Sequence, residues 1–343
     1  MKRLLVTGGS GFIGSHTVVE LIQKGYEVVI FDNLTNSSPV VLDRISKITK
    51  MPVEFVKGDL RDKCIVNDVF EKYNFDAVLH FAGLKAVEES VQEPMRYYDN
   101  NVFGTLQLLD VMERHDIKKL VFSSSATVYG CGKELPFRED MELGIPSNPY
   151  GMTKLVIEKI LSDMQKADDT WRIMCLRYFN PVGAHPSGLI GEDQRGVPNN
   201  LMPFLTQTAL GKREYLNIFG GDYPTPDGTA IRDFIHVVDL AKAHVCALQK
   251  CNETRGCNIV NIGKGKGYSV LEVLRAFEKT SNLKIPFKVV EKRVGDVAIS
   301  VADTRLAESF LSWRASLSLD DMCKHSWNWQ SKNPEGYSEQ KIV

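Results

Sequence analysis

Short apolar segments alternate with amphipathic segments through the first half of the chain. The apolar segments cover residues 4–7, 27–31, 53–56, 77–81, 120–123 and 173–178. Helical stretches fill most of the intervals, and the first carries Ile13, Thr17 and Leu21 on one face before Gly25. Near-continuous apolar strands separated by amphipathic helices are typical of a parallel sheet buried on both faces. The pattern therefore predicts an α/β fold with a Rossmann-like, doubly wound parallel sheet.

The pattern changes after residue 180. Residues 181–200 are rich in Pro, Gly and Asn, as loops are, and residues 201–343 show shorter elements between turn signals. We expect a large domain over residues 1–180 and a smaller α/β lobe, mainly over residues 181–343, that closes over the carboxyl ends of the strands. Segments near 233–262 belong either to that lobe or to the large domain, and the pattern leaves both open.

Composition narrows the classes of partner. Hydrophobic residues make up 43% and charged residues 25% of the 343 residues, and the net charge is −1. Without a basic surplus, neither nucleic acid nor an anionic membrane is an expected partner. The cysteines are odd in number and lack C-x-x-C spacing, so we expect reduced thiols in a cytoplasmic protein and no metal site. The chain begins directly with a strand pattern, which argues against a signal peptide, and no apolar run is long enough to span a bilayer.

A glycine-rich turn follows the first apolar segment. Gly8, Gly11 and Gly14 form G-x-x-G-x-x-G ahead of a helical stretch. Gly8 suits a tight turn, Gly11 lets the backbone approach a pyrophosphate, and Gly14 lets the helix pack closely on the sheet. Phosphates would then face the positive end of the helix. The motif predicts dinucleotide binding, and the alternative is an ordinary strand–helix turn.

Residues at the next strand ends extend this prediction. Asp32 ends the second apolar segment, where a carboxylate accepts hydrogen bonds from ribose hydroxyls and repels the 2′-phosphate of NADP, so NAD is favoured. The other interpretation of Asp32 is a turn former at a strand end. Asp59 and Leu60 end the third segment near the expected adenine edge. Phe81 and Ala82 end the fourth, where a small residue leaves room for a cofactor.

Tyr150 and Lys154 lie four residues apart and share one face of a helix. A tyrosine has a pKa of about 10, but an adjacent ammonium and a positive nicotinamide ring both favour its phenolate. Tyr150 is therefore a candidate general base whose pKa Lys154 would lower. Ser125, at the end of the fifth apolar segment, places a hydroxyl where it can hydrogen-bond a substrate oxygen, and the alternative is a serine-rich turn.

The Y-x-x-x-K spacing is weak by itself because it occurs three times. Glycines interrupt the occurrence at Tyr129 and Lys133, and the one at Tyr337 and Lys341 lies in a polar tail for which we expect no core. Only Tyr150 stands at the start of a convincing helix, with a proline in its first turn.

These motifs belong to a larger set. It includes D-N-L-x-N-S at 32–37, Y-Y-D-N-N-V-x-G-T at 97–105, S-S-S-A-T-V-Y-G at 123–130, Y-G-M-T-K at 150–154, R-Y-F-N-P at 177–181, N-N-L-M-P at 199–203, D-G-T-x-x-R-D at 227–233 and G-D-V-A at 295–298. The set resembles the extended short-chain dehydrogenase/reductase superfamily. More narrowly, the chain resembles the UDP-glucose 4-epimerase family over nearly its whole length.

The resemblance implies a mechanism. Tyr150 would take the proton of the sugar 4-hydroxyl with Ser125 bridging, and Lys154 would bind the nicotinamide ribose. The C4 hydride would pass to NAD, and the 4-keto sugar would rotate and take it back on its other face, which interconverts UDP-galactose and UDP-glucose. The resemblance also implies a homodimer, in which the helix over 94–114 and the helix beginning near 149 are candidates to pair across a two-fold axis.

The resemblance further assigns the binding residues. For NAD they are Gly8, Gly11, Phe12, Ile13, Gly14, Asp32, Asn33, Asn36, Asp59, Leu60, Phe81, Ala82, Lys85, Asn100, Tyr150, Lys154 and Tyr178. For the UDP-sugar they are Ser125, Asn180, Asn200, Leu201, Asn217, Phe219, Arg232, Arg293, Asp296 and Ser300. Arginines suit a diphosphate and Phe219 suits the uracil ring.

Two positions refine the expected reaction. Related dehydratases and decarboxylases carry an extra acid or base directly after the serine, whereas Ala126 and Thr127 stand here, which favours epimerisation alone. Ser300 matches a position where the family carries either tyrosine or a small residue, so we hypothesise that UDP-N-acetylhexosamines are also accepted. The neighbouring Val301 departs from the family pattern. The open alternatives are an epimerase of another UDP-sugar, such as a uronate or pentose, and a catalytically silent NAD- or UDP-sugar-binding regulator.

Overall fold

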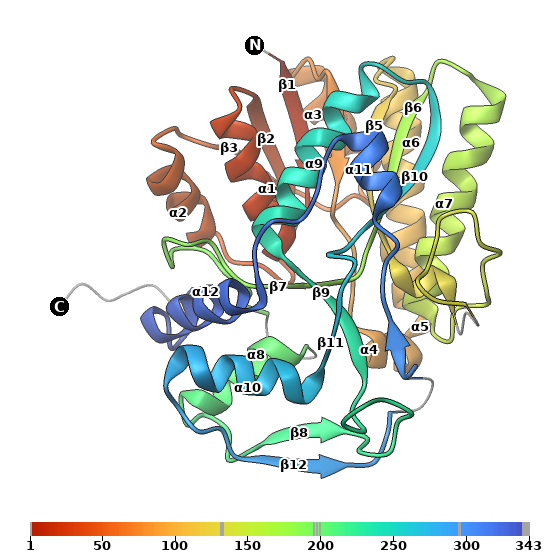
Figure 1. Cartoon of the computed structure of the whole chain (residues 1–343). Coiled ribbons are helices and arrows are strands. Elements are labelled where there is room, and N and C mark those ends of the chain that lie inside the picture. The colour runs from red at the N-terminus through yellow and green to blue at the C-terminus, as the bar shows by residue number, and fades with distance from the viewer. Residues whose placement is uncertain are drawn as a thin grey trace.

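The computed structural model describes residues 2–130, 134–194, 196, 198, 200–293 and 296–337. Its main element is a seven-stranded parallel sheet (Figure 1). In spatial order the strands are β10 (Gly256–Ile262), β6 (Arg172–Tyr178), β5 (Lys119–Ser125), β4 (Ala77–His80), β1 (Arg3–Thr7), β2 (Glu27–Asp32) and β3 (Glu54–Lys57). All six expected strands are present, so the predicted α/β, Rossmann-like fold is confirmed.

Alternate residues of each strand pack against opposite layers of helices. Leu4 and Val6 of β1 are buried in one core, and Leu5 between them is buried in the other. Because of this period-two alternation, both faces of the sheet are buried from solvent. The first layer contains α1 (Phe12–Gln23), α2 (Val40–Thr49), α9 (Val237–Cys251) and α11 (Arg305–Leu311); the second contains α3 (Lys63–Lys72), α6 (Gly104–Arg114) and α7 (Pro149–Ala167).

Residues beyond 180 contribute to both lobes. Strand β10 extends the large sheet beside β6, and α9 packs against α1, β5 and β6. The strand that precedes α9 lies elsewhere, in a small sheet of β7 (Asn180–Val182), β9 (Ile231–His236), β11 (Gly267–Ser269) and β13 (Ile299–Ser300). Because β7 follows β6 directly, this small sheet begins at the carboxyl edge of the large one.

A third hydrophobic core holds the second lobe together, in the lower part of Figure 1. It lies among α8 (Leu201–Ala209), α10 (Val270–Ser281), α12 (Leu319–Lys332) and β8 (Leu216–Phe219), which pairs in parallel with β12 (Phe287–Val290). Capping boxes at Ser269 and Ser318 fix where α10 and α12 begin.

The helix expected over 94–114 is continuous but not uniform. It consists of α5 (Pro94–Tyr97), a π-helical turn η1 (Tyr98–Phe103) and α6, and it follows α4 (Val87–Gln92). A short 3₁₀ turn, η2 (Ala126–Tyr129), leaves the end of β5. Within the described residues, every helix is too short or too polar to cross a bilayer.

Candidate active site

The glycine turn after β1 forms one wall of a cavity. Gly8 has φ +69°, and a Cβ there would lie 2.6 Å from the backbone nitrogen of Ala82. A Cβ on Gly14 would lie 2.3 Å from the carbonyl oxygen of Gly8, so α1 could not pack this closely on the turn with any side chain. Helix α1 has no side-chain cap, which leaves its first N–H groups for a ligand.

Ser10 tests whether this turn suits a phosphate group. Its Oγ is buried and has no hydrogen-bond partner among the described residues. An unpaired buried hydroxyl costs stability unless a ligand or water satisfies it. Together with the free N–H groups of α1, this hydroxyl fits the pyrophosphate of a dinucleotide.

Asp32 lies at the end of β2 beside the turn. Its carboxylate accepts hydrogen bonds from the backbone of Ser10 at 3.0 Å and Leu34 at 2.9 Å, and from Ser37 Oγ at 3.0 Å. Burial raises the pKa of Asp32, and these three hydrogen bonds oppose the rise. The carboxylate is therefore held in place at the position where the ribose hydroxyls of NAD are expected.

Asp59 continues this wall from the end of β3. Asn33 Nδ2 donates to Asp59 Oδ2 at 3.0 Å. The Arg61 guanidinium hydrogen-bonds the same carboxyl and holds its pKa well below its usual range. The predicted residues Asn33 and Asp59 therefore hold each other in place at the end of the cavity where the adenine is expected.

Tyr150, Lys154 and Ser125 meet at the end of β5. Asn148 caps α7 by accepting a hydrogen bond from the Gly151 backbone at 2.9 Å, so Tyr150 stands in the first turn as predicted. The Tyr150 side chain hydrogen-bonds Ser125. Lys154 Nζ donates to the Ser123 carbonyl oxygen at 2.6 Å and lies 6.0 Å from the centroid of the Tyr150 ring.

The orientation of Ser125 follows from Thr127. Ser125 Oγ accepts hydrogen bonds from Thr127 Oγ1 at 3.0 Å and from the Thr127 backbone N–H at 3.3 Å. With its oxygen occupied, the Ser125 hydroxyl can donate to the oxygen of Tyr150. Thr127 therefore fixes the direction of the serine proton.

Burial governs the protonation of the tyrosine and the lysine. It raises the pKa of Tyr150, and the hydrogen bond from Ser125 acts in the opposite direction. It lowers the pKa of Lys154 to about 8, against which Glu158 acts. Burial therefore outweighs the hydrogen bond from Ser125, and the phenolate requires the positive charge of Lys154 together with a further positive charge nearby.

Glu192, which the sequence did not single out, joins two predicted binding residues across the cavity. Its Oε1 accepts hydrogen bonds from Lys85 Nζ at 2.8 Å and from Asn200 Nδ2 at 2.9 Å. Glu192 belongs to no sequence motif. Its partners lie 107 and 8 residues away along the chain, and only the folded structure brings the three side chains together.

Asn101 is a second residue that the sequence analysis missed. It is 2% exposed and links the loop after β4 to α7 through hydrogen bonds with the Leu84 backbone and with Thr153 Oγ1. Its Oδ1 also accepts from the predicted residue Asn100 at 2.9 Å. The motif at 97–105 contains both asparagines, but only Asn100 was predicted as a binding residue.

One cavity of about 350 Å³ collects most of the predicted residues. Its lining includes Gly8, Gly11, Phe12, Ile13, Gly14, Asp32, Asn33, Asn36, Asp59, Leu60, Phe81, Ala82, Lys85, Asn100, Ser125, Tyr150, Lys154, Tyr178, Asn180 and Asn200. The predicted residues outside the lining are Leu201, Asn217, Phe219, Arg232, Arg293, Asp296 and Ser300. The first group spans the whole predicted NAD site, and the second belongs to the smaller lobe.

Five of the seven residues in the second group contact one another. Arg232 and Ser300 are register partners on β9 and β13, and Arg232 forms an ion pair with Asp296. The Arg293 guanidinium lies 4.0 Å from the centroid of the Phe219 ring. The Asp296 backbone N–H donates to the Arg293 carbonyl oxygen at 3.2 Å and so links the two sets. Two arginines and an aromatic ring therefore lie in one part of the smaller lobe, which suits a nucleoside diphosphate.

The expectation for Tyr337 is wrong. The residue is 8% exposed, its ring centroid lies 4.7 Å from that of Trp329, and its hydroxyl donates to the Gly191 carbonyl at 3.1 Å. Tyr337 packs on α12 because burial of its large aromatic ring is favourable, although the residues around it in the sequence are polar. Lys341 and Lys133, the lysines of the two other Y-x-x-x-K occurrences, lie outside the described residues.

Comparison with known proteins places the chain in a family. Residues 4–263 match the model of the NAD dependent epimerase/dehydratase family, and the chain belongs to that family. It is 53% identical over 339 residues to a UDP-glucose 4-epimerase of Neisseria meningitidis serogroup C, across 99% of this chain and 100% of that protein. It is 53% identical over 345 residues to the UDP-glucose 4-epimerase of Homo sapiens, across 99% of each. The resemblance inferred from the motifs is confirmed.

A solved structure agrees with the fold. The UDP-glucose 4-epimerase from Bifidobacterium longum, in complex with NAD+ and UDP, matches with a TM-score of 0.95 at 52% identity. The match covers 98% of this chain and 100% of that chain.

Gly14→Ala should weaken NAD retention, because the new Cβ would meet the Gly8 carbonyl oxygen and push α1 from the turn. Overpacking of this kind costs about 1–3 kcal/mol. We expect less NAD per chain after acid release and a lower melting temperature. Gly104→Ala is the matched control, since its Cβ would lie 3.4 Å from Leu60 Cβ, an ordinary contact. Full NAD content in Gly14→Ala would contradict the assignment.

Proposed function

We propose that this protein interconverts UDP-galactose and UDP-glucose by NAD-dependent epimerisation at C4 of the sugar. The observation that carries the proposal is the meeting of Tyr150, Ser125 and Lys154 in the cavity that the glycine turn lines. The similar proteins of N. meningitidis and H. sapiens are named UDP-glucose 4-epimerase, and the similar B. longum structure holds NAD+ and UDP, which supports the same ligands here.

The residues of the large domain would hold the cofactor. The N–H groups at the start of α1, with Ser10 Oγ, would bind the pyrophosphate, and Asp32 would accept hydrogen bonds from the ribose. Bound NAD supplies the acceptor and donor of a hydride at the sugar C4, and its positive ring adds the charge that the Tyr150 phenolate needs.

The catalytic side chains would then move one proton. Tyr150 takes the proton of the sugar 4-hydroxyl and returns it after the sugar has turned. Ser125, whose oxygen is held by Thr127, donates to the Tyr150 oxygen and so favours the phenolate. Lys154 supplies a buried positive charge that is still mostly protonated at neutral pH.

The substrate would lie between the two lobes. Asn180 and Asn200 line the cavity from the side of the smaller lobe. Beyond them, Arg232 and Arg293 would pair with the diphosphate, and Phe219 would pack against the uracil. The sugar C4 is thereby directed toward Tyr150.

Proton NMR of the anomeric region tests the proposal with UDP-galactose and no added NAD. We expect UDP-glucose to appear and to approach a fixed ratio from either side. Tyr150→Phe should lower kcat by about 10²–10⁴-fold, because it removes the base but keeps the ring. Tyr26→Phe, a tyrosine outside the cavity, is the matched control.

Absence of conversion, even with added NAD, would contradict the proposal and favour the two alternatives. Conversion of a UDP-uronate or UDP-pentose instead would identify another UDP-sugar epimerase. Retained NAD without turnover of any UDP-sugar would identify a silent binder.

We also propose that UDP-N-acetylhexosamines are accepted, because Ser300 is small and neighbours Arg232 in the smaller lobe. Ser300→Tyr would fill volume near the sugar. The kcat/KM for UDP-N-acetylgalactosamine should fall by about tenfold or more relative to that for UDP-galactose. UDP-galactose turnover by the same variant is the internal control. An unchanged ratio of the two kcat/KM values would refute the proposal.

A cytoplasmic homodimer is the assembly that we propose. Five exposed apolar side chains lie on the successive elements α4, α5, η1 and α6: Val87, Val91, Met95, Phe103 and Leu106. Met95 is 77% exposed, an unusual position for a large apolar side chain.

Among the described residues, no group of three or more His, Cys, Asp or Glu side chains is placed to hold a metal ion.

Met95→Glu combined with Leu106→Glu should separate the dimer, because two carboxylates would be buried without partners at the interface. Light scattering should give twice 38.5 kDa for the wild type and one chain for the variant. Met51→Glu, at an apolar residue that is 54% exposed elsewhere, should leave the mass unchanged. A monomeric wild type would refute the assembly.

A further inference from the structure

Helix α7 carries a third ionisable residue on the face of Tyr150 and Lys154. Glu158 follows Lys154 by one turn, and its side chain is 3% exposed. Its Oε1 accepts from Ser124 Oγ at 2.5 Å and Arg177 Nε at 3.0 Å, and its Oε2 accepts from the Arg177 guanidinium at 2.7 Å. Both carboxylate oxygens are thus occupied by partners other than Lys154.

This choice of partners matters because a lysine and a glutamate four residues apart on a helix can form an ion pair with each other. Here Lys154 Nζ instead donates to the Ser123 carbonyl, on the strand that ends at Ser125. A carboxylate paired with Lys154 would cancel the charge that the Tyr150 phenolate needs and would draw the ammonium away from β5.

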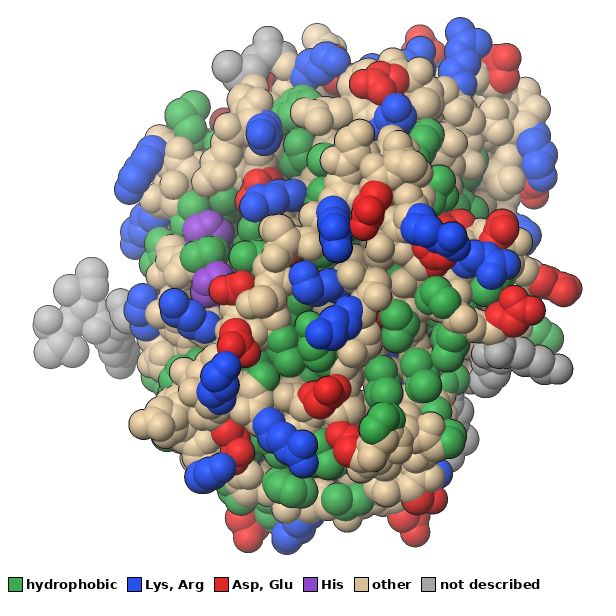
Figure 2. Space-filling view, in the orientation of Figure 1, with side chains coloured by type: hydrophobic (Ala, Val, Ile, Leu, Met, Phe, Trp, Pro, Cys, Tyr) green, Lys and Arg blue, Asp and Glu red, His purple; other side chains and the backbone are tan. Residues whose placement is uncertain are grey.

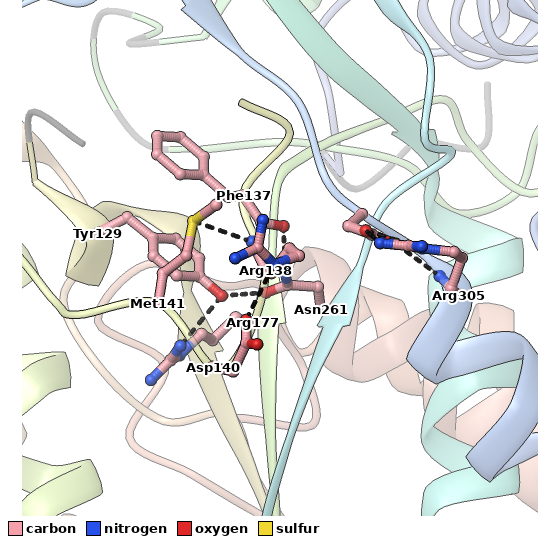
Figure 3. Close-up of polar contacts among 9 residues, drawn as sticks. Tyr129, Phe137, Arg138, Asp140, Met141, Arg177, Asn261 and Arg305 are labelled. Atoms are coloured by element: carbon pink, nitrogen blue, oxygen red, sulfur yellow. Dashed lines mark hydrogen bonds and ion pairs between the residues drawn. The ribbon is translucent and has the colours of Figure 1, made fainter. Parts of the chain in front are cut away.

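Arg177 is fixed from its other side. Its side chain is 1% exposed, and its guanidinium donates to the Tyr129 hydroxyl at 3.0 Å and lies 4.8 Å from the Tyr129 ring centroid. Tyr129 donates to Asn261 Oδ1 at 2.7 Å, and Asn261 Nδ2 donates to the Phe137 carbonyl at 2.8 Å. Figure 3 shows Arg177, Tyr129, Asn261 and Phe137 joined in this way between η2, β6 and β10.

We propose that Arg177 is a positioning residue that pairs with Glu158, so that the negative charge of Glu158 does not offset the positive charge that Lys154 presents to Tyr150. This inference rests on the proposed role of Tyr150 as the base. Arg177 and Glu158 touch neither substrate nor cofactor, since neither lines the cavity. Their effect reaches the reaction through Lys154 and through Ser124, the neighbour of Ser125.

The other titratable groups that interact with this cluster lie on β4, β6, β10, η2 and the loop after η2. They are His80 of β4, Cys175 and Tyr178 of β6, Cys257 of β10, Tyr129 of η2 and Glu139 of the following loop. Burial lowers the pKa of His80 to about 3 and raises that of Tyr178, so both are neutral at pH 7. Glu139 accepts from the Asn261 backbone at 2.7 Å rather than from Arg177. Lys154, Glu158 and Arg177 therefore dominate the local charge.

The sign of the effect differs between the two members of the pair. Arg177→Met leaves an unpaired negative charge, which disfavours the phenolate and raises the pKa of Tyr150. Glu158→Gln removes a negative charge, which favours the phenolate and lowers that pKa. Tyr150 and Glu158 lie eight residues apart on α7, which is roughly 12 Å along the helix axis. At an effective dielectric constant of about 20, a change of charge at that distance should shift the pKa of Tyr150 by about one unit.

The experiment compares the wild type, Arg177→Met, Glu158→Gln and the double variant. The acid limb of the kcat–pH profile should move up by about one pH unit in Arg177→Met, down in Glu158→Gln, and back near the wild type in the double variant. The double variant should recover because removal of both charges leaves neither unpaired. Ultraviolet difference titration against Tyr150→Phe in each background reads the phenolate directly, without turnover.

If Arg177 and Glu158 only stabilised the fold, both single variants would have a lower kcat and a lower melting temperature, and the acid limb of the kcat–pH profile would not move. That result would overturn the inference. If Arg177→Met does not fold, a downward shift in Glu158→Gln supports the inference, and an unshifted or upward limb overturns it. If the wild type does not epimerise, the proposed function fails, while the difference titration still decides whether Arg177 and Glu158 set the pKa of Tyr150.

Discussion

The buried ammonium of Lys154 ties helix α7 to the carboxyl end of strand β5 through its hydrogen bond with the Ser123 carbonyl. Desolvation lowers the pKa of this group to about 8, so most of the lysine side chains remain charged at neutral pH. The same contact places Tyr150, one turn earlier on α7, beside Ser125, two residues further along β5. The geometry of the catalytic group therefore depends on a helix and a strand being held at one point.

The parallel sheet explains why cofactor and base share one cavity. The glycine turn follows β1, Asp32 ends β2, and Ser125 ends β5. Because the strands are parallel, these functional groups lie at a single edge of the sheet. The smaller lobe begins at the same edge, because β7 follows β6 along the chain and pairs with β9. Figure 2 shows basic and acidic side chains mixed over one face of the molecule, in keeping with a protein whose phosphate contacts are few and placed rather than spread over a basic surface.

The fold and the large-domain half of the site could be predicted because they rest on local patterns. Apolar strands, the glycine spacing and the four-residue step from Tyr150 to Lys154 are all visible within short windows. Glu192, Asn101 and the Arg177–Glu158 pair were missed because their partners meet only through tertiary packing. The burial of Tyr337 was missed for the same reason, since a tail that returns to α12 leaves no periodic signal. The effect of burial on the pKa of Tyr150 also depends on solvent exclusion, which spacing does not report.

The most direct test of the account follows the hydrogen on C4 of the sugar. UDP-galactose deuterated at C4 should be converted in ordinary water, and the UDP-glucose formed should be examined by NMR. If the reaction proceeds by oxidation and reduction at C4 within the closed site, the deuterium stays at C4 of the product. Replacement of the deuterium by solvent hydrogen would contradict the account, because it would mean that C4 loses its hydrogen as a proton.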